Sequence, residues 1–224
     1  MKKILALFLA LLICATCSGC LYKRFIPGTK DDNLTGNMAQ QPDNYQSEES
    51  EDKNEFDYSS VTIKMNISYD ENTYKETATV YAQDKEGNTI WNRETGAYDV
   101  AQLESFSEIG KKDSKYYYTE GGTVVALDVE TGNVLWKNSD FGGYSVKYVF
   151  AENSMYLCGF FGPDFFEVSY DGATVKRIET INENYWHTRK IKDAGDKIAV
   201  TFDSSEDGNG GTFYVDKKTY SITK

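Results

Sequence analysis

Short segments of β-branched and aromatic residues, separated by turn residues, fill the chain from residue 58 to its end. Residues 61–65, 123–127 and 197–202 are examples, and Gly, Asn and Asp stand between such segments. Turn residues about every 8–12 positions are typical of folds built from many short strands. No stretch of about 11 residues has a clear helical period, and residues 100–109 come nearest to one. The pattern therefore predicts an all-β fold for residues 58–224.

The N-terminus has a basic head and a short apolar run in place of this alternation. Two lysines follow Met1, the ten residues 4–13 are all apolar, and residues 14–20 are small residues and cysteines that end at Cys20. A run of this length is about half of what crosses a bilayer as a helix. Head, run and small-residue exit together predict a secretory signal peptide over residues 1–19.

Residues 17–20 resemble the lipobox of bacterial lipoproteins, in which small residues precede a cysteine that becomes the acylated N-terminus. Ser18 and Gly19 supply the small residues, although Cys17 stands where the family usually has Leu. The resemblance implies that Cys20 carries lipid and anchors the mature protein to the extracytoplasmic face of the cell membrane. An ordinary cleaved signal with an incidental Cys20 is the alternative.

The segment between the lipobox and the strands is acidic and poor in large apolar residues. Residues 28–57 hold nine acidic and two basic residues, a net charge of −7. A segment that buries so little apolar surface cannot offset the entropy of its chain. The composition predicts that residues 20–57 form a lipidated and disordered tether. An acidic recognition tail is the alternative for this segment.

The strand segments repeat with a period near 43 residues. Aspartates that close similar strands stand 44, 43 and 45 residues apart, and they are Asp84, Asp128, Asp171 and Asp216. A polar turn and another strand follow each of them. A repeat of this length has room for four short strands, which is the size of a propeller blade.

Residues 126–136 resemble the blade motif of PQQ-like (quinoprotein-type) β-propellers, Ala-x-Asp-x-x-Thr-Gly-x-x-x-Trp. One copy of the motif is complete, and a second lacks only the Thr of the turn. The matching residues are Ala126, Asp128, Thr131, Gly132 and Trp136 in the complete copy and Ala82, Asp84, Gly87 and Trp91 in the shorter one. The last two units keep the strand and its Asp but lose the Gly–Trp end of the motif. The resemblance implies a small PQQ-like β-propeller of about four blades, closed or partial, over residues 58–224.

The motif has a mechanical interpretation that needs no ligand. Asp ends a strand and caps the turn, Gly takes a positive φ, and Trp supplies a large side chain for packing between blades. We therefore expect Trp91 and Trp136 to be packed within the fold. An exposed platform for a sugar or a cofactor is the alternative for these two side chains.

Quinone-dependent oxidoreductases belong to the same propeller family, and their chemistry is the obvious enzymatic hypothesis. They usually have about seven or eight blades and a polar cage for the quinone, commonly with calcium. This chain supplies about four blades and no recognisable cage, and a fold does not imply a chemistry. The sequence therefore predicts no catalytic residue, no cofactor and no enzyme.

Metal-ligating and nucleophilic residues are scarce in the sequence. His187 is the only histidine, and Cys158, the one cysteine after Cys20, lies in an apolar run typical of a buried strand. Residues 203–211 match the opening of a calcium loop, yet Tyr214 stands where a bidentate Glu is required. A flexible acidic hairpin loop is the preferred interpretation, and no metal site is predicted.

The net charge of −11 argues against nucleic acid, because phosphate binding needs a basic surface. The sequence favours a lipid-anchored module at the cell surface that mediates protein–protein interaction in the cell envelope, with an unknown partner protein. Binding of a glycan or a small solute is the second hypothesis, and a quinone-dependent oxidoreductase is the third. Loops rich in Tyr, Asn and Gly are the expected contact surface.

Overall fold

Sixteen β-strands and one 3₁₀ turn form the regular structure of residues 56–99, 105–204 and 210–224, which are the residues that the computed structural model describes. The 3₁₀ turn η1 (Tyr58–Ser60) precedes the first strand. All of these residues belong to one of two units of the chain, Asp52–Lys224. None of them forms a helix long and apolar enough to cross a membrane.

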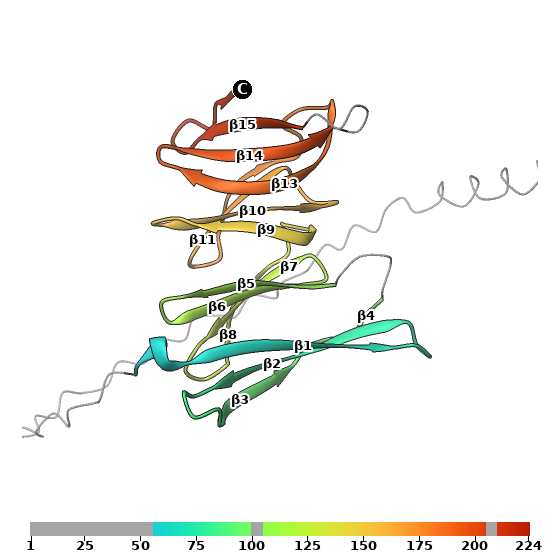
Figure 1. Ribbon diagram of the computed structural model, residues 1–224, viewed down its shortest axis with the longest axis vertical. Helices are drawn as coiled ribbons and strands as arrows, with labels where there is room; N and C mark the ends of the chain where they lie inside the picture. The colour runs from blue at the N-terminus through green and yellow to red at the C-terminus, as the bar shows by residue number, and fades with distance from the viewer. Residues whose placement is uncertain (1–55, 100–104, 205–209) are drawn as a thin grey trace, which may run out of the picture. The chain divides into compact units, whose positions relative to one another are not determined.

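The strands form four antiparallel sheets of four strands each, called blades 1 to 4 in chain order (Figure 1). Blade 1 consists of β1 (Thr62–Asp70), β2 (Lys75–Gln83), β3 (Thr89–Glu94) and β4 (Tyr98–Asp99). Blade 2 consists of β5 (Phe106–Lys112), β6 (Lys115–Glu120), β7 (Thr123–Asp128) and β8 (Val134–Asn138). Blade 3 consists of β9 (Tyr144–Phe150), β10 (Ser154–Phe160), β11 (Phe165–Ser169) and β12 (Thr174–Ile178). Blade 4 consists of β13 (Tyr185–Ala194), β14 (Lys197–Ser204), β15 (Gly211–Asp216) and β16 (Ile222–Thr223).

Blades 2, 3 and 4 are antiparallel meanders, because consecutive strands are hydrogen-bonded neighbours in each of them. Blade 1 departs from this order, since β3 pairs with one end of β2 and β4 pairs with its other end at Lys75 and Glu76. The first strands of successive blades, β1, β5, β9 and β13, contact one another. Four-stranded sheets that adjoin through their first strands are arranged as propeller blades.

Apolar clusters lie between successive blades of the described part of the chain. Each cluster takes residues from both blades, for example Val80 with Tyr118, Tyr117 with Leu157, and Phe165 with Ile198. Blades 2 and 3 are covered on both faces, and their strands β6 and β10 are almost wholly buried as a consequence. The four-bladed all-β fold expected from the sequence is confirmed.

The outer faces of the first and last blades are polar. Lys64 and Asn66 are exposed on the face of β1 opposite to the half-buried Met65. On β13, Lys190 and Lys192 are exposed on the face opposite to the buried Ile191. Terminal repeats of a stacked array need such polar outer faces to stay soluble. Within the described residues the apolar stack therefore runs from blade 1 to blade 4.

The third repeat differs from the alignment expected at Asp171. Strand β11 ends at Ser169, whose backbone N–H donates to the carbonyl oxygen of Ala173 at 3.0 Å. The equivalent bond in blade 2 runs from Asp128 N to Asn133 O, at 2.9 Å. The prediction of a strand-ending Asp171 is therefore wrong, because Ser169 takes that place in a shorter turn. Asp171 lies within the turn, where its carboxylate accepts from the Ala173 N–H at 3.2 Å.

Candidate functional site

The turn of the complete blade motif is closed by Asp128. Its Oδ1 atom accepts from the backbone N–H and from the hydroxyl of Thr131, both at 2.8 Å. Gly132 follows with φ +71°, a left-handed conformation that glycine adopts without strain. Ala126 is fully buried and pairs with Trp136 across β7 and β8. The five motif residues therefore build one turn and the two strands that flank it.

The tryptophan of each motif packs on the turn of the following blade. Trp91 Nε1 donates to the carbonyl oxygen of Val129 at 2.8 Å, and a Cβ on Gly132 would lie 2.6 Å from the Trp91 ring. Trp136 lies on Gly172 in the same way, with 2.7 Å between its ring and the position of a Cβ. The glycine of the turn is therefore required for space as well as for its φ angle.

Lysine and tyrosine replace the tryptophan–glycine pair between blades 3 and 4. Tyr220 takes the turn position of Gly132, because its N–H donates to Asp216 O at 2.9 Å and its φ is +57°. Lys176 Nζ lies 5.2 Å from the centre of the Tyr220 ring, within the range of a cation–π contact. The Tyr220 hydroxyl also donates to Glu167 Oε2 at 2.8 Å. At this turn, the interface between blades 3 and 4 therefore uses a cation–π contact and a hydrogen bond, whereas the other two interfaces use a tryptophan on a glycine.

The shorter motif in blade 1 forms a turn of the same kind. The Asp84 carboxylate accepts from the backbone N–H of Asn88 at 2.8 Å and from its side-chain amide at 2.9 Å, and these bonds hold the pKa of Asp84 below its usual value. Gly87 has φ +87°, and nothing lies within 4 Å of the position of a Cβ. Ala82 is fully buried. The space beside Gly87 is empty because the described residues include no earlier blade whose tryptophan would cover this glycine.

Two glycine-bearing loops pack backbone against backbone at one end of blade 3. Residues 141–144 and 159–162 approach so closely that a Cβ on Gly162 would lie 2.6 Å from the Cα atom of Gly143. The second loop carries Phe161, which is 78% exposed and has φ +58°. A bulky aromatic residue rarely adopts this backbone conformation, and strain of this kind concentrates at functional sites.

A cleft of about 310 Å³ opens beside Phe161, between blades 3 and 4. The residues that line it include three aromatic residues, Phe160, Phe161 and Tyr185, and two acidic residues, Asp164 and Glu179. The ring centres of Phe160 and Phe161 lie 4.4 Å apart. Aromatic faces and carboxylates in one cleft can hold a group that is both flat and cationic.

The two carboxylates of the cleft differ in their electrostatic surroundings. Arg177 forms an ion pair with Glu179 and holds the pKa of Glu179 below its usual value. Burial raises the pKa of Asp164, and the charge of Glu179 adds to this shift. The N–H of Ile181 donates to Asp164 Oδ2 at 2.6 Å and opposes the shift. Asp164 forms no ion pair with any residue of the described ranges.

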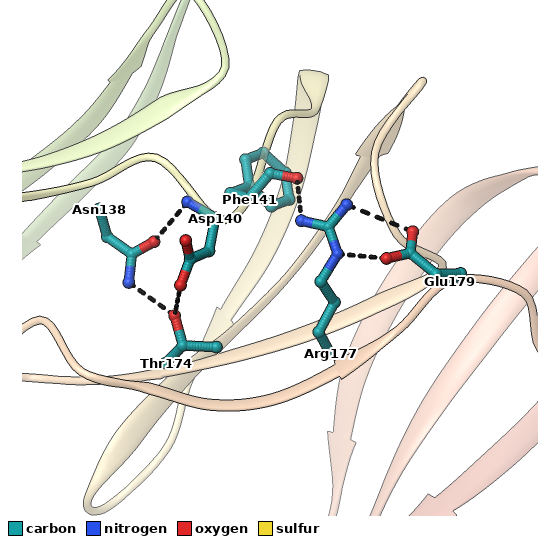
Figure 2. Close-up of polar contacts among 6 residues, drawn as sticks. All are labelled: Asn138, Asp140, Phe141, Thr174, Arg177 and Glu179. Carbon is teal, nitrogen blue, oxygen red and sulfur yellow. Dashed lines mark hydrogen bonds and ion pairs between the residues drawn. The ribbon is translucent and has the colours of Figure 1, made fainter. Parts of the chain in front are cut away.

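A polar network next to the cleft joins blade 2 to blade 3 (Figure 2). Asn138 Nδ2 donates to Thr174 Oγ1 at 2.8 Å, and the Thr174 hydroxyl donates to Asp140 Oδ2 at 2.7 Å. Arg177 Nη1 donates to the carbonyl oxygen of Phe141 at 3.1 Å. The network fixes the segment after β8 against β12. It also positions Arg177, which forms the ion pair with Glu179 of the cleft.

A second groove, of about 470 Å³, lies along the first strands of blades 1 to 3. Its walls include Ile67 and Lys147 together with two carboxylates. Glu76 Oε2 accepts from the N–H of Ser105 at 3.0 Å, and Glu108 Oε1 accepts from the hydroxyl of Tyr116 at 3.0 Å. Each of these two carboxylates thus accepts one hydrogen bond from a neighbouring segment, as Asp164 does in the first cleft.

No protein-family model and no curated protein matches this chain. Among solved structures, BamB from Moraxella catarrhalis is 16% identical over 70% of this chain and 45% of BamB, with a TM-score of 0.44. The computationally designed Ika4 protein is 12% identical over 66% of this chain and 88% of Ika4, with a TM-score of 0.41. The WD40 β-propeller domain of Doa1 is 13% identical over 69% of this chain and 51% of that domain, with a TM-score of 0.38. The chain thus spans less than half of BamB, and the likeness is one of fold only.

Of the remaining candidate residues, Cys158 and His187 lie within the described ranges, whereas Cys20 and part of the candidate calcium loop do not. Cys158 is fully buried in β10, and burial raises the pKa of its thiol to about 12. His187 lies in β13, where its backbone pairs with that of Asp203. Cys20 lies outside the described residues, as do positions 205–209 of the candidate calcium loop. Within the described ranges no three His, Cys, Asp or Glu side chains are grouped so that they could hold a metal ion.

The sequence analysis singled out none of the residues that line the cleft. Asp164, Glu179 and Tyr185 come from three separate segments, and no motif connects them. The one local sign is the pair of phenylalanines between Gly159 and Gly162. Glycine on both sides of an apolar pair marks a tight turn, and a tight turn can turn a large side chain toward solvent.

Proposed function

We propose that this protein is a non-catalytic protein-binding module, anchored by lipid on Cys20 at the extracytoplasmic face of the cell membrane. The observation that carries the proposal is Phe161. An aromatic ring that is 78% exposed contributes nothing to the core, and its positive φ costs the fold stability. Aromatic residues are enriched in protein–protein interfaces relative to the rest of the surface, so an exposed ring held at such a cost favours a surface that a partner covers.

The surroundings of Phe161 support a docking surface. Gly162 packs closely on Gly143, and a loop packed against its neighbour loses less entropy when a partner binds than a loop without such contacts. Large aromatic side chains in such positions carry much of the energy of protein interfaces. The cleft beside the ring gives a partner a pocket in which to place one side chain.

The glycan hypothesis receives less support. It called for exposed aromatic side chains, and the two tryptophans named as a possible platform, Trp91 and Trp136, are half-buried between blades and donate their indole N–H groups to backbone oxygens. A sugar platform needs a free aromatic face. Each of these two rings already packs on the glycine of the next turn.

Site-specific photocrosslinking in intact cells tests the proposal. The full-length chain would carry a photoreactive benzoylphenylalanine in place of Phe161, and a matched chain would carry it in place of Ile90, which is 41% exposed on blade 1. We expect a discrete crosslinked protein from position 161 and none from position 90. The same product from both positions, or none from position 161, would refute the proposal.

A further inference from the structure

The cleft between blades 3 and 4 contains one carboxylate with a cation and one without. Glu179 binds Arg177 through two of the guanidinium nitrogens, Nε and Nη2. Figure 2 shows Arg177 between Glu179 and the carbonyl oxygen of Phe141, to which Nη1 donates at 3.1 Å. All three nitrogens of the Arg177 guanidinium therefore donate hydrogen bonds, two of the nitrogens to Glu179 and one to the backbone of Phe141.

Asp164 is the carboxylate without a cation. Its Oδ2 atom accepts from the N–H of Ile181 at 2.6 Å, and no hydrogen bond to its Oδ1 atom is found among the described residues. Burial of a carboxylate is costly unless a charge or several donors compensate it. One backbone N–H compensates only part of this cost. Asp164 is therefore the carboxylate of this cleft that is left for a cationic ligand to pair with.

The aromatic walls restrict the shape of that charge. Phe161 and Phe160 stand with ring centres 4.4 Å apart, and Tyr185 lines the same cleft. A guanidinium group is flat, stacks on aromatic faces and donates in a fork that matches a carboxylate. A lysine ammonium is compact and strongly hydrated, and it gains less from such walls.

The size of the cleft restricts its occupant further. A volume of about 310 Å³ lies at the lower end of the range for small-molecule sites, and it suits one side chain of a larger ligand. The strong negative charge of the whole chain, −11, also favours a basic partner during encounter. Both observations agree with a peptide segment that inserts a single basic side chain.

The geometry points to this cleft as the docking site for an arginine side chain on the protein partner. The guanidinium donates to Asp164 Oδ1, and the exposed ring of Phe161 stacks on it. Phe161 and Asp164 both line the cleft. The inference rests on the proposed function, because it names the chemistry by which the partner is held.

Peptide binding to the full-length chain in non-ionic detergent tests the inference by saturation-transfer NMR. The probes are acetyl-Ala-Arg-Ala-amide and its lysine and leucine counterparts. We expect saturable binding of the arginine peptide, binding of the lysine peptide weaker by about fivefold, and none of the leucine peptide. Equal binding of the lysine or leucine peptide, or no binding of any, would overturn the inference.

Variants of the cleft locate the binding. Asp164→Asn should weaken binding of the arginine peptide by about tenfold or more, because a charge-assisted hydrogen bond is lost. Phe161→Ala should weaken it by about two- to fivefold. The matched controls Asp99→Asn and Ile90→Ala change exposed residues of blade 1 and should leave the affinity unchanged. Unchanged affinity of the Asp164→Asn chain would overturn the inference, and its melting temperature, measured in parallel, shows that the fold is retained.

The crosslinking experiment separates this inference from the proposed function. If position 161 still yields the crosslinked partner in a chain that also carries Asp164→Asn, the arginine site is wrong and the protein-binding function stands. If the arginine peptide binds as expected but position 161 yields no crosslinked protein, the site stands and the proposed function is wrong.

Discussion

Replacement of Trp136 by Ala tests the contact between blades 2 and 3. The indole N–H donates to the carbonyl oxygen of Tyr170 at 3.1 Å, and the ring covers Gly172. The ring centre also lies 5.8 Å from that of the buried Tyr117. Trp136 therefore contributes both a hydrogen bond and a large apolar surface to the interface.

The magnitude follows from what remains after truncation. Loss of a fully buried Trp side chain costs about 3–5 kcal/mol, and the half-burial of Trp136 reduces this range. The Tyr170 oxygen keeps a partner, because Lys115 Nζ donates to it at 2.7 Å. The lost hydrogen bond therefore adds little to the cost. We expect the Trp136→Ala chain to lose about 3 kcal/mol in free energy of unfolding, which corresponds to a fall in melting temperature of about 6–12 °C. A domain with about 5–15 kcal/mol of stability still folds after such a loss.

Thermal melts followed by circular dichroism measure this effect. Leu135→Ala is the matched control, since Leu135 is the neighbouring strand residue and is 45% exposed; its melt should stay close to that of the parent chain. Trp136→Phe keeps most of the ring and should cost about 1 kcal/mol. A Trp136→Ala chain that melts with the Leu135→Ala chain would refute the packing account and return the tryptophans to the role of an exposed platform.

Further predictions concern the turn, the thiol, the cleft and the anchor. Gly172→Ala should cost about 2–4 kcal/mol in urea unfolding, because φ is +95° and the new Cβ meets the indole of the preceding blade. Cys158, with its pKa raised to about 12, should resist iodoacetamide at pH 8 in the native chain and react when urea unfolds it. Burial raises the folded pKa of Asp164 above 3.8, so native stability falls as the pH rises through that folded pKa; Asp164→Asn should melt higher than the parent chain at pH 7 and lose this advantage at pH 3. Cys20→Ala should abolish metabolic labelling with palmitate and release the chain from membranes, since the two acyl chains of a lipid anchor supply the hold.

The sequence predicts the scaffold well because the scaffold depends on local patterns. Alternation in β2 places Ala78, Val80 and Ala82 on one buried face, and the strand follows directly from that period. The Asp–Thr–Gly turn is equally local, since Asp128 bonds only three residues ahead to Thr131. The repeat of these local units is enough to predict four blades.

Contacts between blades depend on pairs that one sequence does not reveal. The sequence analysis explained Gly132 by its φ angle alone, whereas the structure adds the ring of Trp91, a residue of the preceding blade, which leaves no space for a Cβ. The sequence analysis expected both of the last two units to lose the Gly–Trp end of the motif, but this is wrong for the glycine of the third unit, because Gly172 lies under Trp136 as Gly132 lies under Trp91. At the interface between blades 3 and 4, Lys176 takes the place of the tryptophan and Tyr220 takes the place of the glycine. Both members of the contacting pair therefore change together. Such a paired exchange is visible only when both positions are known to touch.

The cleft was missed for a related physical reason. Asp164, Glu179 and Tyr185 line one cleft because the start of β11, the end of β12 and the start of β13 are brought together by the packing of blade 3 on blade 4. Phe161 breaks the local rules, since a phenylalanine with φ +58° and 78% exposure satisfies neither backbone preference nor burial. Sequence rules predict the residues that obey them.

The replacement of the Trp–Gly pair by Lys176 and Tyr220 occurs at the same interface as the cleft. The first two interfaces between blades keep Trp on Gly, and the third replaces that pair with Lys176 on Tyr220. The cleft with Phe161 and Asp164 opens at this same third interface. Natural sequences are consistent with their fold except where function requires otherwise, and each exception there costs stability. A strained phenylalanine and a carboxylate without a cation are two such costs at one place, and an arginine from a partner would offset both.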